Sequence, residues 1–160
     1  MILIADSSAL ISLAIVDKLD ILEKLFSKVY VPRAVYNEIS IEKKLESIKL
    51  VNYCKERVLD IESKVNFNIS LGLGESEAII LYKEQNAHFL LCDDKKAKKF
   101  AQNFGIKVIG TLGVLLKAKE KNYIKSIAPL IEILRESPIF IDDKTVTLVL
   151  KMAGELEPNN

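Results

Sequence analysis

Six acidic side chains stand where a short apolar segment gives way to a helical pattern. They are Asp6, Glu38, Glu75, Glu77, Asp93 and Asp94. Asp6 illustrates the arrangement, because it ends the apolar run at 2–5 and precedes the small polar pair Ser7 and Ser8. In a right-handed parallel sheet, the passages from strand to helix lie along one edge. We therefore expect four to six of these carboxylates to gather at that edge.

The chemistry that suits such a cluster is binding of a divalent metal ion. Neighbouring carboxylates repel and raise each other's pKa, and a cation removes that penalty. The chain has one histidine, His88, and its two cysteines lack metal-ligand spacing. Oxygen ligands alone favour Mg²⁺ or Mn²⁺. Such ions activate water and stabilise the leaving oxygen when a phosphodiester is cleaved.

A simpler interpretation places the acids at helix N-termini for structural reasons. Asp6 could cap the helix that follows, and Glu75 or Asp94 could interact with a helix dipole, worth ~0.3–1 kcal/mol each. For each acid taken singly, both interpretations are open. Capping does not explain Glu38, which lies between apolar Val35 and Ile39.

The elements that must position these acids alternate between strands and amphipathic helices, which is typical of an α/β protein. We predict strands at 2–5, 29–31, 89–92 and 107–109, with a further short strand at 48–53. Helices are predicted at 8–16, 19–26, from Pro32 onward, and at 75–84, 95–104, 112–121, 127–136 and 142–154. The expected fold is a three-layer α/β/α single domain over 1–160, with a mainly parallel sheet of four to five strands.

Composition narrows the class of protein. The chain has 160 residues, 49% hydrophobic and 28% charged, with a formal net charge of +1. These values predict a globular domain whose net charge gives no overall electrostatic attraction to nucleic acid or membrane. No apolar stretch approaches the ~20 residues of a membrane span. Cys54 and Cys92 are expected to be reduced thiols, which predicts a cytoplasmic protein.

Four segments together resemble the PIN domain family. They are Asp-Ser-Ser-Ala-Leu-Ile at 6–11, Val-Pro-Arg-Ala-Val-Tyr-Asn-Glu at 31–38, Gly-Glu-Ser-Glu-Ala-Ile at 74–79 and Leu-Leu-Cys-Asp-Asp at 90–94. The segments at 109–115 and 152–155 resemble a branch of small prokaryotic PIN proteins described as nucleic-acid-binding. The resemblance implies a metal-dependent nuclease that cleaves single-stranded RNA, often as the toxin of a toxin–antitoxin pair.

The resemblance also implies a catalytic set. Matching the family's acids gives Asp6, Glu38, Glu77 and Asp93, held around Mg²⁺ or Mn²⁺. Glu75 competes with Glu77 as a metal ligand, and Asp94 competes with Asp93.

Substrate and partners follow from the same resemblance. Ser8 resembles a small hydroxyl residue expected to touch metal-bound water or phosphate, although it could also cap a helix. Arg33, Lys95 and Lys96 are candidates for phosphate contacts, with a solvated surface as the simpler interpretation. Expected partners are RNA, an antitoxin protein and a second copy of the chain, with no membrane. The alternative is a PIN-like binding module with weak or no catalysis, since Glu77 stands where the family usually has Asp.

Overall fold

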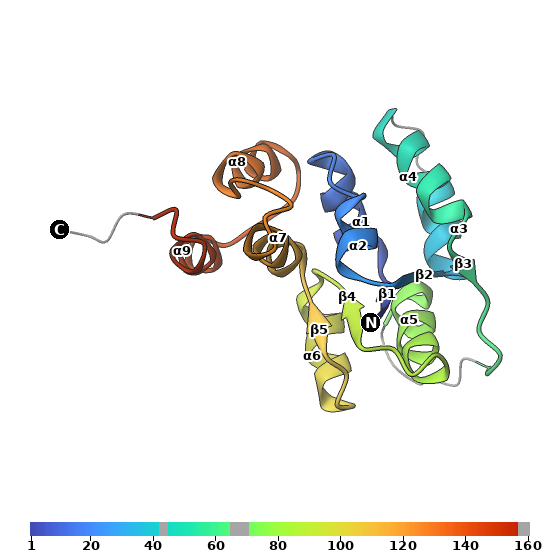
Figure 1. Ribbon diagram of the computed structural model, residues 1–160. Coiled ribbons are helices and arrows are strands. Elements are labelled where there is room, and N and C mark those ends of the chain that lie inside the picture. The colour runs from blue at the N-terminus through green and yellow to red at the C-terminus, as the bar shows by residue number, and fades with distance from the viewer. Residues whose placement is uncertain (42–44, 65–70, 157–160) are drawn as a thin grey trace.

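A five-stranded parallel sheet forms the centre of the protein in the computed structural model, which describes residues 1–41, 45–64 and 71–156 (Figure 1). The strands lie in the order β3-β2-β1-β4-β5. Their bounds are β1 Ile2–Ala5, β2 Lys28–Pro32, β3 Val58–Leu59, β4 Phe89–Leu91 and β5 Val108–Ile109. The predicted three-layer α/β/α fold with a parallel sheet is confirmed.

The order of the strands places a switch point between β1 and β4. The chain runs from β1 outward to β2 and β3 on one side, and later from β4 to β5 on the other. Ile4 of β1 pairs with Tyr30 of β2 and with Leu90 of β4. Open α/β sheets bind ligands outside the carboxyl ends of strands at such a point. Asp6 and Asp93 both lie there, directly after β1 and shortly after β4.

Helices cover both faces of the sheet, so the strands are apolar on both sides. Along β1, Leu3 and Ala5 belong to one core and Ile4 to the other. The smaller core uses α5 Leu73–Glu84 and α6 Lys95–Asn103. The larger core uses α1 Ser7–Ile15, α2 Ile21–Leu25, α3 Arg33–Ile41, α4 Leu45–Lys55, α7 Thr111–Glu120, α8 Ala128–Glu136 and α9 Asp143–Met152. Figure 1 shows α8 and α9 beyond α7, away from the sheet.

The prediction of a strand at 48–53 is wrong, because this segment belongs to helix α4. Leu50 and Cys54 are both buried, with exposed fractions of 3% and 0%. Their spacing of four residues is that of one helix face. The strand that does form, β3, follows at Val58–Leu59 and pairs with Val31 and Pro32 at the edge of the sheet.

The end of the described chain is tied to the start of α8 by Glu155. Its carboxylate accepts hydrogen bonds from the backbone N–H groups of Ile127 at 2.7 Å and Ala128 at 2.8 Å. Ser126 Oγ and Lys119 Nζ donate to it at 2.6 and 2.7 Å. Burial alone would raise the pKa of Glu155, but these donors lower it to about 2. The segment 152–155 therefore fastens the C-terminal end of α9 beside α7 and α8.

Candidate active site

Asp6 is a buried carboxylate with one oxygen unpaired. Asp6 is 2% exposed and occupies the N-cap position of α1, but its side chain makes no capping hydrogen bond. Ser8 Oγ donates to Asp6 Oδ2 at 3.2 Å, and Cys92 Sγ donates to the same oxygen at 3.5 Å. Within the described residues, Asp6 Oδ1 is buried and has no hydrogen-bond partner. Side-chain capping is thus not the role of Asp6.

The environment of Asp6 disfavours its charged form. Burial raises its pKa from 3.8 to about 6, and the negative charge of Glu75 adds to this effect. The backbone N–H of Ser7, and then the side chains of Cys92 and Ser8, act in the opposite direction without cancelling it. A buried carboxylate in this state gains from a cation that replaces the lost water.

Glu38 reaches the same region from α3. Ser7 Oγ donates to its Oε2 at 3.2 Å, and a Cβ placed on Gly74 would lie only 2.7 Å from its Oε1. The absence of a side chain at Gly74 therefore lets the carboxylate lie against the first turn of α5. The pKa of Glu38 is raised by burial first, and then by the charges of Glu75 and Glu77.

The structure gives Glu75 and Glu77 different surroundings. Glu75 lines a small pocket together with Asp6, Ala78 and Cys92. Glu77 points to the start of α3, where its Oε2 accepts the backbone N–H of Ala34 at 2.8 Å. One acid thus faces Asp6, while the other satisfies a helix N-terminus.

Asp93 lies between the end of β4 and the start of α7. Its Oδ1 accepts the backbone N–H of Thr111 at 2.7 Å, and its Oδ2 accepts Thr111 Oγ1 at 2.6 Å and Ser12 Oγ at 3.2 Å. Its own backbone N–H donates to Ser8 Oγ at 3.1 Å. Because Ser8 also donates to Asp6, its hydroxyl joins the ends of β1 and β4. Ser8 is therefore a link between the two acids, and it does not cap α1.

Asp94 has a structural task. It is exposed and N-caps α6, with its Oδ1 accepting the backbone N–H of Ala97 at 2.8 Å. Of the two adjacent aspartates, Asp93 is the one that hydrogen-bonds to α1 and α7.

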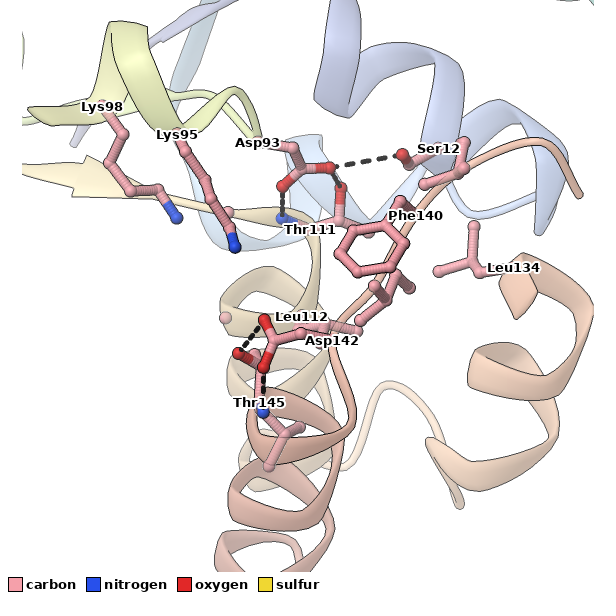
Figure 2. A pocket seen from close by; sticks show the side chains of 15 residues that line it. Ser12, Asp93, Lys95, Lys98, Thr111, Leu112, Leu134, Phe140, Asp142 and Thr145 are labelled. Carbon is pink, nitrogen blue, oxygen red and sulfur yellow. Dashed lines mark hydrogen bonds between the residues drawn. The ribbon is translucent and has the colours of Figure 1, made fainter.

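The basic candidates lie at different places around the acids. Arg33 donates to both carboxylate oxygens of Asp60, at 3.0 and 3.3 Å, and lies over the ring of Tyr36. Lys95 starts α6 and points toward the ring of Phe140, and Lys96 is exposed on the same helix. Arg33 is thus held by Asp60, whereas Lys95 borders a pocket that also contains Asp93 (Figure 2).

Ser7, Ser12, Cys92 and Thr111 contact the acids, but they did not emerge as site residues from sequence. Thr111 carried a usable signal, because Gly110 and Thr111 follow a predicted strand exactly as Asp6 does. Gly110 is needed there, since a Cβ on it would lie 2.9 Å from Asp93 Oδ1. Ser12 and Cys92 gave no such signal, because a serine inside a helix and a cysteine in a strand are ordinary core residues.

The acids suit a divalent cation in type and in burial. All are hard oxygen donors, and the unpaired Asp6 Oδ1 together with the nearby charges of Glu75 and Glu38 marks where positive charge is lacking. As the side chains lie, no three His, Cys, Asp or Glu residues in the described parts of the chain form a group that could hold a metal ion. Metal binding would have to draw the carboxylates closer together.

Fold and site together define an α/β protein with an acidic site at the switch point of a parallel sheet. Residues 2–155 match the model of the DUF3368 family, a PIN domain, and the chain therefore belongs to the PIN domain family. PIN domains are generally nucleases and typically use divalent metal ions.

Among solved structures, the chain is similar in fold to a PilT N-terminus domain protein from the archaeon Sulfolobus solfataricus P2. It shares 23% sequence identity with a TM-score of 0.55, over 74% of this chain and 93% of that one. No curated protein matches the sequence. No helix in the described ranges has the length and apolar character needed to cross a bilayer.

Proposed function

We propose that this protein is a metal-dependent endoribonuclease that cleaves single-stranded RNA. The observation that carries the proposal is Asp6, a buried carboxylate with an unpaired oxygen at the carboxyl end of β1. A chain that kept this residue only to cap α1 would use its side chain in a capping hydrogen bond, and the side chain of Asp6 makes no such bond. Membership of the PIN domain family supports nuclease chemistry at this position.

The residues proposed to hold Mg²⁺ or Mn²⁺ are Asp6, Glu38 and Glu75, with Asp93 beside them. Glu75 is preferred to Glu77 because it lies in the pocket of Asp6, whereas Glu77 binds the amide of Ala34. Bound metal would supply an activated water and stabilise the leaving oxygen. Ser8 keeps the carboxylate of Asp6 oriented, and Gly74 leaves the space that Glu38 needs.

The decisive experiment compares Asp6→Asn with the wild-type chain on a fluorescent single-stranded RNA. We expect wild-type cleavage with Mg²⁺ or Mn²⁺, none with EDTA, and at least a 100-fold loss in the variant, a size typical when one essential electrostatic contact is removed. Asp20→Asn is the matched control, because Asp20 is an exposed aspartate that forms a surface ion pair with Lys24. Undiminished cleavage by Asp6→Asn would reject the assignment.

A binding module without catalysis is the second candidate function. It is favoured by the separation of the acids, no three of which form a metal-holding group within the described residues. Calorimetric titration with Mn²⁺ separates the two functions. Heat of binding that disappears in Asp6→Asn supports the nuclease, and absence of binding in both chains supports the module.

A toxin role within the cytoplasm, opposed by an antitoxin protein and carried by a homodimer, is the finer form of this proposal. The resemblance of the four acidic segments supports it. Induced expression in a bacterial host should stop growth, and Asp6→Asn should restore growth at an equal protein level. Growth arrest that persists in the variant would assign the toxicity to something other than RNA cleavage.

A further inference from the structure

A pocket of about 250 Å³ is lined in part by Asp93, and it shares no lining residue with the small pocket of Asp6. Its walls come from α6, from the start of α7 and from the C-terminal segment that includes Phe140 and α9. Figure 2 shows Lys95 and Lys98 extending into this space from α6, with the ring of Phe140 facing it from the loop between α8 and α9. We propose that this pocket binds one unpaired nucleotide of the RNA, its base stacked on Phe140 and its phosphate held by Lys95 and Lys98. The inference rests on the proposed function for the identity of the nucleic acid.

Phe140 is the first reason for this assignment. It is 82% exposed, the largest exposed fraction among the large hydrophobic residues of the described chain. Exposed aromatic rings are stacking platforms for unpaired bases, because every base presents a π-face. Lys95 Nζ lies 6.0 Å from the centre of the Phe140 ring, so a cation borders the platform where a phosphate would follow a stacked base.

The charges of the pocket are the second reason. Two carboxylates line it, and both have hydrogen-bond donors of their own: Asp93 accepts from Thr111 and Ser12, and Asp142 caps α9 by accepting from Thr145 N at 2.9 Å and Oγ1 at 2.7 Å. Lys95 lies in electrostatic range of Asp142 and helps to lower its pKa. Neither Lys95 nor Lys98 forms an ion pair within the described residues, so their ammonium groups remain available to a phosphate.

Position and size are the third reason. Lys98 Nζ would lie 3.5 Å from a Cβ on Gly110, and Asp93 Oδ1 would lie 2.9 Å from the same point. A phosphate held by Lys98 would therefore lie close to Asp93, which is linked to Asp6 by the hydroxyl of Ser8. The pocket is near the lower limit of ligand pockets, ~300 Å³, which suits one nucleotide and excludes a duplex.

The chain allows a direct test of stacking because it contains no tryptophan. Phe140→Trp introduces a single indole at the platform, and we expect a short oligouridylate in EDTA to quench its fluorescence in a saturable way. Phe104→Trp is the matched control. Phe104 is also exposed, at 46%, and also has a lysine over its ring, with Lys83 Nζ at 4.9 Å, but it lies at the opposite end of α6. Quenching of both variants to the same extent, or of neither, would overturn the proposal.

Affinity measurements extend the test to the unlabelled side chains. With a fluorescein-labelled oligouridylate in EDTA, Phe140→Ala should raise Kd by roughly 5- to 100-fold, the range expected for loss of one stacked base. Lys98→Met should reduce the slope of log affinity against log salt concentration by about the amount of one phosphate contact. Lys99 is a neighbouring exposed lysine, and Lys99→Met should leave that slope unchanged. Wild-type affinity in Phe140→Ala refutes the pocket. Because Phe140 is exposed, the substitution does not threaten folding.

The two proposals fail in distinguishable ways. If the wild-type chain cleaves RNA and Phe140→Ala binds the oligouridylate with wild-type affinity, the proposal of a nucleotide-binding pocket is overturned and the proposed nuclease function is supported. Quenching of Phe140→Trp in a protein that does not cleave RNA supports the pocket and overturns the nuclease. A wild-type chain that binds no oligouridylate in EDTA overturns the pocket.

Discussion

Replacing Asp6 by Asn should make the protein more stable at neutral pH in the absence of metal, although it removes the carboxylate proposed as catalytic. The reason is the burial of Asp6, which raises its pKa from 3.8 to about 6. The folded state keeps the proton up to about pH 6, whereas the unfolded chain releases it near pH 3.8. Between these values the folded state binds more protons, so the free energy of unfolding falls as pH rises.

The size of this effect follows from the two pKa values. Their difference, at about 1.4 kcal/mol per pH unit, corresponds to a destabilisation of about 3 kcal/mol that is complete above pH 6. In Asn the side chain carries no charge at any pH, and its oxygen can still accept from Ser8 and Cys92. The stability difference between Asp6→Asn and wild type should therefore grow from near zero at pH 4 toward about 3 kcal/mol at pH 8.

Urea denaturation in EDTA, repeated from pH 4 to pH 8, measures this difference. Asp20→Asn should show a nearly constant difference across the same range. Adding Mn²⁺ at pH 8 should stabilise the wild-type chain by mass action and leave Asp6→Asn unchanged. Two results would refute the assignment of a buried carboxylate with a raised pKa at this position. One is a variant less stable than wild type at pH 8 without metal, and the other is a stability difference that does not change with pH.

Four further substitutions separate the roles of the acids near the site and away from it. Ala in place of Glu75 should remove RNA cleavage without lowering the free energy of unfolding, because Glu75 repels its acidic neighbours. Ala in place of Glu77 should retain cleavage, but the free energy of unfolding measured in urea should fall by about 1 kcal/mol, as for a lost helix cap. The reverse result would make Glu77 the metal ligand. Ala in place of Gly74 should reduce kcat at least tenfold, since its methyl group would lie 2.7 Å from Glu38 Oε1, even though Ala normally favours a helix; unchanged kcat would exclude Glu38. Gln in place of Glu155 should lower the free energy of unfolding by about 1–3 kcal/mol at pH 7, and urea titrations should show the difference shrinking from pH 4.5 toward about 2, where the wild-type carboxylate itself becomes protonated; a difference independent of pH would contradict this.

The sheet and most of its helices could be predicted because their signals are local. The apolar run at 2–5 became β1, and the helix predicted at 95–104 formed as α6, which is followed by Gly105 at φ +72°. The prediction of a strand at 48–53 failed because a short apolar run has no unambiguous period. Only packing showed that Leu50 and Cys54 share a buried helix face. The strand β3 is two residues long and owes its existence to pairing with β2.

The sequence by itself determined that this chain carries acids at strand-to-helix passages, because the order of apolar runs and helical patterns dictates that edge. It could not divide the work among them, since hydrogen-bond partners come from segments far apart in the chain. Only the tertiary structure turned Glu77 toward the amide of Ala34 and Glu75 toward Asp6. The cap that Asp94 forms on α6 is local by contrast, because its partner Ala97 is three residues away. Tertiary contact also brought Phe140 of the C-terminal segment to the lysines of α6. Burial, which no residue fixes alone, is what raises the pKa of Asp6.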